Sequence, residues 1–249
     1  MNPGHINSPG FFLYHNLLLL KTFAEKVISF FKELEYKGSL PPGISVMNPF
    51  RDNPEIIPVI SEFYTKFYFD TNPRHLILGI NPGRFGAGVT GIPFTDTKRL
   101  DEKCGLLIPG IKTFETSSVF VYEMIDAFGG VEKFYSKFFI SAVSPLGFTS
   151  ESKKGSAVNY NYYDSRKLTD AIYGFIIESL TRQLQFGIEH DICFCLGTGQ
   201  NYKFLIQLNE KHKLFKKIVP LEHPRYVMQY KSKLKQMYIN KYIEEFRKA

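Results

Sequence analysis

The chain has 249 residues, of which 44% are hydrophobic and 22% are charged, so it is long enough to bury a sizeable core and is not a disordered polypeptide. Its net charge of +7 is unevenly placed, because segment 211–249 alone carries +8. A basic segment on a near-neutral body favours a polyanionic partner. No apolar run approaches the ~20 residues of a membrane-spanning helix.

The first elements are expected to be helical. Ser8 and Pro9 are typical of a helix start, apolar residues recur at helical spacing from Phe11 to Leu34, and Gly38 follows the last of them. A Pro-rich connection at 41–50 and a second helix at 55–68 complete a helical extension over residues 8–70. The apolar stretch near the N-terminus contains polar residues and no basic segment precedes it, so we expect no signal peptide.

Four short apolar runs after this extension are typical of buried strands, at 75–80, 138–143, 191–196 and 218–221. Helical patterns lie between them at 118–128, 165–186 and 200–214, and a basic helix is expected from about residue 229. Strands that alternate with helices predict a parallel sheet covered on both faces. The expected fold class is therefore α/β, a three-layer α/β/α domain with a central four-stranded parallel sheet. We expect one domain over residues 1–249 and a monomer.

Ligands of such sheets bind outside the carboxyl ends of the strands. The four predicted strands are followed by NPGRFG, SPLGF, GTGQN and EHPRY, so these loops should meet at one edge. The first loop belongs to the stretch LILGINPGRFGAGVTGIPF, residues 76–94, whose many glycines allow close approach of the backbone to a ligand. Asn81, Pro82 and Gly83 alone would also suit an ordinary turn, and GTGQN a fragment of a dinucleotide loop that lacks its third Gly.

These loops resemble those of the uracil-DNA glycosylase superfamily, most closely its single-strand-selective monofunctional branch. The family motif G-M-N-P-G-x-F-G, followed by T-G-x-P-F, is similar to residues 79–86 and 90–94 of this chain. The second family motif begins His-Pro after the last strand and is similar to Glu222-His223-Pro224-Arg225. Gly197-Thr198-Gly199 looks like the G-x-G loop of the family.

The resemblance implies a role for each matching residue. Asn81 would orient the attacking water, and His223 would donate to the anion that forms on the departing base at O2. Phe94 would stack on the extruded base, and Gly83 would leave room beside the C5 edge of a pyrimidine. Ile80 is expected in the same substrate pocket.

Further residues are expected to contact DNA. Arg225 and Tyr226, with Val227 and Met228, have the size for a wedge that fills the gap left by an extruded base. The backbone N–H groups at Gly197, Thr198 and Gly199 suit a phosphate. Lys231, with Lys233 and Lys235, would add salt-sensitive contacts to the DNA backbone.

The chain departs from the family at the end of the second strand. The vertebrate members carry an Asn there that reads the uracil edge, in the context N-x-C-P-L, and Ala142 stands in its place. Ser144, or Asn159 and Asn161 in the run NYNYYD, are the candidates for a substitute.

Three cysteines cannot form a four-thiolate metal site, and Cys193 and Cys195 share a predicted strand, where small apolar residues are buried. We therefore expect no metal and no redox cofactor. A reducing compartment is expected, the cytoplasm of a bacterium or the nucleus of a eukaryote. No Lys stands in the motifs as an amine nucleophile, so a lyase step is not expected.

The function expected from these observations is that of a monofunctional DNA glycosylase of base-excision repair, which hydrolyses the N-glycosidic bond of uracil or a related deaminated base. Two alternatives stay open at this point. One is a nucleic-acid-binding protein with the same fold and no catalysis. The other is a hydrolase of free nucleosides or nucleotides.

Overall fold

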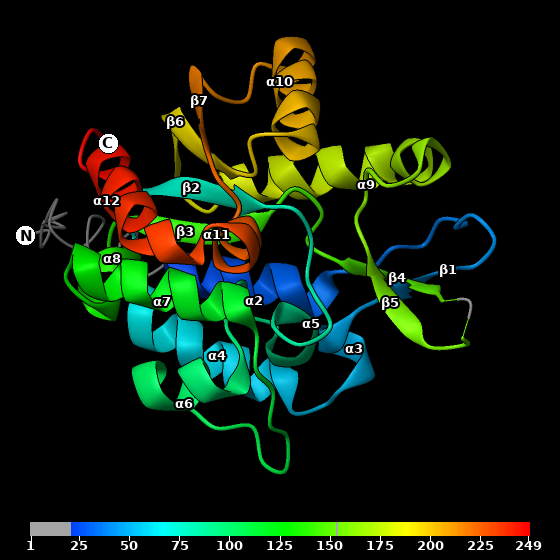
Figure 1. Ribbon diagram of the computed structural model, residues 1–249, viewed down its shortest axis with the longest axis horizontal. Helices are drawn as coiled ribbons and strands as arrows, with labels where there is room; N and C mark the ends of the chain where they lie inside the picture. The colour runs from blue at the N-terminus through cyan, green and yellow to red at the C-terminus, as the bar shows by residue number, and fades with distance from the viewer. Residues whose placement is uncertain (1–20, 153) are drawn as a thin grey trace, which may run out of the picture.

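Four parallel strands form the centre of the protein. The computed structural model describes residues 21–152 and 154–249. In spatial order the sheet is β3-β2-β6-β7, and each pair of neighbours is parallel (Figure 1). The strands are β2 (Arg74–Gly79), β3 (Phe138–Ala142), β6 (Ile188–Leu196) and β7 (Lys217–Leu221). The four predicted strands and their parallel arrangement are confirmed.

The central strands β2 and β6 contain continuous apolar runs because both faces of the sheet are covered there. Leu76, Ile77 and Leu78 are successive residues of β2, point to alternate faces, and are all at most 1% exposed. A sheet with one wet face would show alternation of apolar and polar residues instead. The continuous apolar runs in the sequence therefore indicate a parallel sheet that is buried on both faces.

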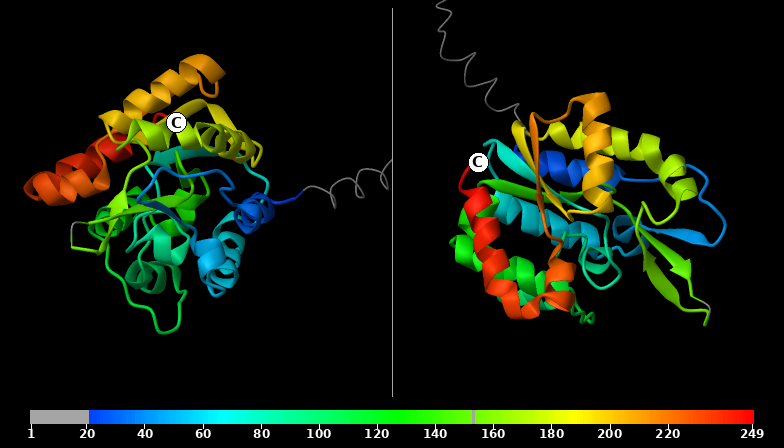
Figure 2. Two further views of the ribbon diagram at one scale, coloured as in Figure 1. Left: turned by 90° about the vertical axis from the view of Figure 1, so that its right-hand side faces the viewer. Right: turned by 45° about the horizontal axis from the view of Figure 1, so that its top comes forward.

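Helices lie on both sides of this sheet, as Figures 1 and 2 show. On one side are α9 (Arg166–Leu184) and α10 (Gln200–His212), and on the other are α4 (Ile56–Tyr68) and α7 (Thr116–Phe128). The predicted three-layer α/β/α class is confirmed. The remaining helices are α2 (Phe23–Glu33), α3 (Pro49–Asp52), α5 (Ala87–Thr90), α6 (Thr97–Cys104), α8 (Val131–Tyr135), α11 (Pro224–Tyr230), the 3-10 helix η1 (Ser232–Leu234) and α12 (Lys235–Phe246).

A second, antiparallel sheet was not predicted. It has the order β1-β4-β5, with β1 (Ile44–Met47), β4 (Gly147–Glu151) and β5 (Ala157–Tyr160). The hairpin of β4 and β5 projects beside the main body (Figure 1). Its strands are four or five residues long, and β5 exposes three of its four residues. Short, polar strands of this kind carry no apolar periodicity that a sequence pattern could reveal.

The N-terminal helix differs from the prediction. Helix α2 begins at Phe23, because Thr22 caps it: the Thr22 side chain accepts from the Glu25 N–H, and the Glu25 carboxylate accepts from the Thr22 N–H. This capping box fixes a helix start, so the predicted helix over 11–34 is wrong as one continuous element. Its first part, residues 11–20, lies outside the described residues.

The C-terminal helix is also wrong as predicted. A helix starting near residue 229 would run through Lys231, but α11 ends at Tyr230 and α12 begins at Lys235. The 3-10 turn η1 separates them. Helix α12 packs Ile239, Tyr242, Ile243 and Phe246 into the core. The bend lets α11 stand at the carboxyl edge of the sheet while α12 runs back along the body.

The three cysteines are buried and free, as expected for core residues. Across residues 21–152 and 154–249, no helix has the length and apolar character needed to cross a membrane.

Candidate active site

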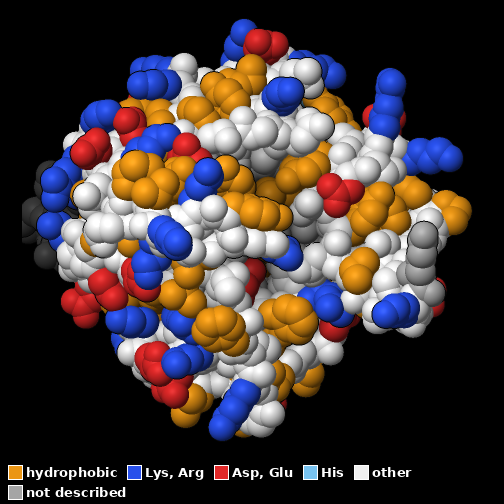
Figure 3. All heavy atoms as spheres, in the orientation of Figure 1, with side chains coloured by type: hydrophobic (Ala, Val, Ile, Leu, Met, Phe, Trp, Pro, Cys, Tyr) orange, Lys and Arg blue, Asp and Glu red, His pale blue; other side chains and the backbone are white. Residues whose placement is uncertain are grey.

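A cavity of about 290 Å³ lies at the carboxyl edge of the central sheet. Its wall comes from the ends of β2 and β3, the loops after them, β5, the start of α7, and α11. Figure 3 shows this face hollowed near its centre, where α11 and the loop after β2 meet in Figure 1. The residues that line the cavity include Gly79, Ile80, Asn81, Gly83, Phe94, Glu115, Ala142, Asn159, Asn161, His223, Arg225, Tyr226, Gln229 and Tyr230. The loops after β2 and β7, predicted to converge, do so.

Phe94 forms an aromatic wall of this cavity. Its backbone has a φ of 53°, a left-handed conformation that side chains other than Gly rarely adopt. The ring lies directly over Gly79, since a Cβ on Gly79 would stand 2.9 Å from Phe94 Cε2. The Phe94 and His223 ring centroids are 5.6 Å apart. A strained backbone at a ligand cavity is typical of a functional position.

His223 is held in one tautomer by the helix that it begins. It is the N-cap of α11, and its Nδ1 accepts the backbone N–H of Arg225 at 3.2 Å. An accepting Nδ1 carries no proton, so in the neutral ring Nε2 is the N–H donor. Burial, with a further contribution from the Arg225 charge, lowers the pKa of His223 to about 4. At neutral pH the ring is therefore an uncharged N–H donor.

Asn81 is fixed by backbone groups at the end of the antiparallel sheet. Its Oδ1 accepts the N–H of Tyr162 at 3.0 Å, and its Nδ2 donates to the carbonyl of Tyr160 at 3.3 Å. One more hydrogen bond joins the loop after β2 to strand β5: the Arg84 N–H donates to Asn159 Oδ1 at 3.0 Å. The unpredicted strand β5 therefore sets the orientation of the Asn81 amide.

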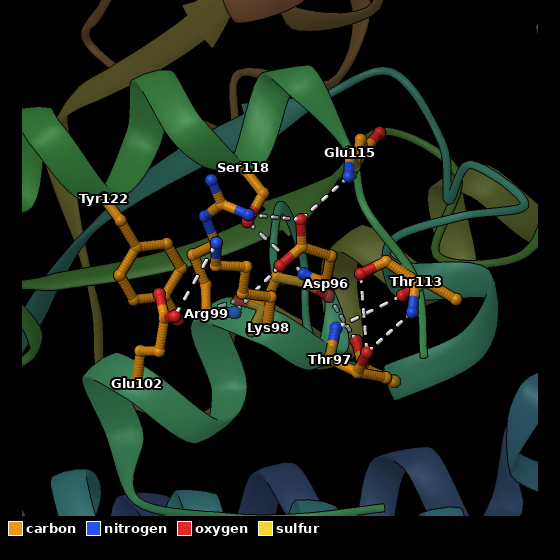
Figure 4. Close-up of polar contacts among 11 residues, drawn as sticks. Asp96, Thr97, Lys98, Arg99, Glu102, Thr113, Glu115, Ser118 and Tyr122 are labelled. Atoms are coloured by element: carbon orange, nitrogen blue, oxygen red, sulfur yellow. Dashed lines mark hydrogen bonds and ion pairs between the residues drawn. The ribbon is translucent and has the colours of Figure 1, made fainter. Parts of the chain in front are cut away.

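Glu115 is a cavity residue that was not predicted from the sequence. It stands at the N-cap of α7, and its backbone N–H donates to Asp96 Oδ2 at 2.7 Å (Figure 4). Asp96 is completely buried and also accepts from the backbone and guanidinium of Arg99. Burial, followed by the negative charge of Asp96, raises the pKa of Glu115 to about 7, while the Arg225 charge opposes this. No residue pattern marks Glu115, because the loop before it is irregular.

Helix α11 presents two tyrosines at the mouth of the cavity. Tyr226 and Tyr230 are 43% and 66% exposed, and their ring centroids are 5.6 Å apart. Arg225 is exposed on the same helix and also lines the cavity. Val227, expected in the same wedge, is wrong for that role because its side chain is completely buried in the core.

Several predicted residues lie away from the cavity wall. Ser144 is buried and does not line it, and its hydroxyl donates to the Leu146 carbonyl at 2.9 Å. Asn161 does line it, but its Nδ2 donates to Asp164. The loop Gly197-Thr198-Gly199 precedes α10 outside the wall, and the Gly197 N–H is already used by the Leu221 carbonyl. Lys231 caps the end of α11 beyond the wall.

Known proteins with the same sequence pattern and the same fold identify the family. The family model described as the uracil DNA glycosylase superfamily matches residues 66–247. The chain belongs to this superfamily. It is also similar to a crystal structure of wild-type SMUG2 from Pedobacter heparinus, with 56% sequence identity and a TM-score of 0.90 over 92% of this chain and 98% of that one. A search of curated proteins gives no match.

The family predicted from the motifs is therefore confirmed, and the protein is a DNA N-glycosylase of base-excision repair. The matched region begins in the last turn of α4 and takes in the cavity residues from Gly79 to Tyr230. Within the part of the chain that the structure describes, no three or more His, Cys, Asp and Glu side chains are grouped as a metal site.

Proposed function

We propose that this cavity receives an extruded uracil, or a related deaminated base, and that Asn81, His223 and Phe94 carry out hydrolysis of its N-glycosidic bond. The observation that supports this most is that all three residues line one cavity although 142 positions separate Asn81 from His223. Phe94 offers a ring face on which a flat base can stack. Ile80 and Gly83, from the first family motif at residues 79–86, also line the cavity.

His223 stabilises the leaving base in this proposal. Cleavage of the C–N bond places negative charge on the base, and a preorganised N–H donor stabilises such charge strongly in a cavity that excludes water. The neutral ring, with Nδ1 held by Arg225 N–H, presents Nε2–H for this task. We assign that donor to O2 of the base.

Asn81 positions the attacking water. An amide is too weak a base to remove a proton, so its contribution is orientation. Its Oδ1 has two lone pairs, and the Tyr162 N–H occupies one of them, which leaves one for a water molecule. Because backbone groups hold both ends of the amide, it cannot rotate away from the water.

DNA binding is assigned to the surface around the cavity mouth. Arg225 and Tyr226, with Tyr230 beside them, are placed to fill the space left by the extruded nucleotide. Lys231 follows on the same side. We keep the prediction of phosphate contacts at Thr198 and Gly199, but not at Gly197, because its N–H donates to the Leu221 carbonyl. Asn161 remains a candidate base contact from its place in the wall. The monomeric state and the compartment stay predictions.

The experiment is excision of uracil from an oligonucleotide, detected as strand cleavage after alkali, for the wild type, Asn81→Ala and His223→Ala. His190→Ala is the matched control, because His190 is exposed and lies in the amino-terminal half of β6. The proposal requires excision by the wild type and the control, and a loss of about a hundredfold or more in the two variants. Binding without excision of any deaminated base would favour a silent DNA-binding protein. Hydrolysis of free nucleosides that salt does not affect would favour a nucleoside hydrolase.

A further inference from the structure

Two polar groups on the wall beside Gly83 have no hydrogen-bonding partner in the described part of the chain: the Glu115 carboxyl and the Asn159 amide nitrogen. A Cβ on Gly83 would lie 3.4 Å from Glu115 Oε1 and 3.6 Å from Asn159 Nδ2. Both groups therefore stand at the same part of the wall. Ala142, whose methyl side chain can make no hydrogen bond, lines the same cavity at the position where the vertebrate family members carry an Asn that reads the base edge.

The Asn159 amide can offer only a donor to this part of the wall. Its Oδ1 accepts the backbone N–H of Arg84 at 3.0 Å, and this contact fixes which end of the amide is oxygen. The remaining group is the NH₂, which donates and cannot accept. A keto oxygen satisfies it, whereas an exocyclic amino group leaves two donors facing each other. Deamination converts an amino group of the base into a keto oxygen.

Glu115 faces a reaction that builds negative charge on the base. An ionised carboxylate at the cavity wall would oppose that charge, whereas a neutral carboxylic acid would donate its O–H to it. The charged groups near Glu115 are Asp96 at the start of α6 and Arg225 in α11. The other titratable groups of the wall are His223, Tyr226 and Tyr230. The Asp96 carboxylate accepts from three donors, and a second negative charge beside it is disfavoured.

We infer that Glu115, as a neutral acid, and Asn159 together donate hydrogen bonds to the keto oxygen of the extruded base next to Gly83. This inference rests on the proposed function, since it assigns the edge of the base opposite to the O2 edge that His223 contacts. The two donors replace the amide that is missing at Ala142. Glu115 contributes to the rate, because its hydrogen bond strengthens as the base becomes an anion, and Asn159 contributes selectivity against amino-bearing bases.

The pH dependence of excision tests Glu115. The rate of the wild type on a single-stranded oligonucleotide with one uracil, measured in single-turnover conditions, should fall about tenfold or more between pH 6.5 and 9 as Glu115 ionises. Glu115→Gln keeps a neutral donor at every pH, so its rate should be a few-fold lower at pH 6.5 but change less than about threefold over that range. Glu115→Ala should lose about tenfold or more at pH 6.5. Glu62→Gln removes an exposed carboxylate from α4 and is the control.

Uracil excision by an Asn159 variant tests the donor role of Asn159. Asn159→Asp keeps an acceptor for the Arg84 N–H and replaces the NH₂ by an oxygen, so uracil excision should fall about tenfold or more while the fold is retained. A wild-type pH profile in Glu115→Gln would overturn the role of Glu115, and unchanged uracil excision by Asn159→Asp would overturn that of Asn159. Absence of excision by the wild type itself would instead refute the proposed function.

Discussion

Asn81 and Tyr162 are joined across the two sheets of the molecule: the Asn81 side-chain oxygen accepts the Tyr162 backbone N–H at 3.0 Å. Asn81 follows the central strand β2, whereas Tyr162 follows β5 of the antiparallel sheet. The contact therefore couples the loop after β2 to the peripheral hairpin of β4 and β5. Catalytic geometry at Asn81 depends on this hairpin.

Replacing Asn81 by Ala should remove the water-orienting group and both hydrogen bonds to the hairpin. We expect the single-turnover rate to fall about a hundredfold or more. The free energy of unfolding should fall by about 1–2 kcal/mol, because two backbone groups are left without a partner. Rapid-quench kinetics and urea unfolding measure the two effects. A rate within threefold of the wild type would exclude Asn81 from the chemistry.

The stability of the protein should reflect the depressed pKa of His223. In the unfolded chain a His takes up a proton near pH 6.5, while burial keeps the folded ring neutral until its pKa of about 4. The unfolded state therefore binds more protons between these values, and the stability that the neutral ring contributes is present above pH 6.5 and lost as the pH falls toward 4. We expect a loss on the order of 2 kcal/mol, allowing for partial exposure.

His223→Gln should lose less stability than the wild type between pH 7 and pH 5, because Gln does not titrate. Urea unfolding at both pH values measures the difference. Equal losses in the two proteins would show that the folded ring titrates like an ordinary His.

Gly79→Ala should displace the stacking ring. The new Cβ would lie 2.9 Å from Phe94 Cε2, closer than real Cβ atoms approach, so the Phe94 ring must move. We expect a loss of about 1–3 kcal/mol in stability and about tenfold in rate. Gly174→Ala, on the exposed side of α9 where nothing lies within 4 Å of the new Cβ, is the control. An unchanged rate in Gly79→Ala would show that the position of Phe94 does not matter.

The basic C-terminal segment divides into two parts with different expected roles. Lys235 and Lys241 pair with Glu123 and Glu222, and Lys217 begins β7 at the edge opposite to the cavity. Lys231 and Lys233 follow α11 and form no ion pair within the described residues. Of the lysines in this segment, Lys231 and Lys233 are the two that we expect to bind DNA phosphates.

Substituting Lys231 and Lys233 by Ala should weaken oligonucleotide binding and reduce the slope of log K against log[salt] by roughly one for each phosphate that is no longer neutralised. Lys216→Ala with Lys217→Ala removes the same charge from the opposite edge and should leave the slope unchanged. Fluorescence anisotropy titrations at several salt concentrations provide the slopes. Equal slopes for the two double variants would show that Lys231 and Lys233 contribute no more to DNA binding than the lysines at the opposite edge.

The central sheet was predictable because burial on both faces leaves continuous apolar runs, as in Leu76–Leu78. Asn81, Phe94 and His223 were predictable because they belong to contiguous motifs that follow strands. Glu115 was not, since it acts from an irregular loop and its environment depends on Asp96, 19 positions earlier in the chain. The polar hairpin that orients Asn81 carries no periodic signal. The helix start after Thr22 is set by capping, and the break between α11 and α12 at Lys231 by tertiary packing.

A crystal structure of the Asn81→Ala variant with an oligonucleotide containing one uracil tests the central claim most directly, because the slow variant preserves the substrate. We expect the uracil out of the base stack, with its ring on Phe94 and its O2 within hydrogen-bonding distance of His223 Nε2. A uracil bound elsewhere on the protein, or still stacked in the strand above an empty cavity, would contradict the assignment of this cavity as the active site.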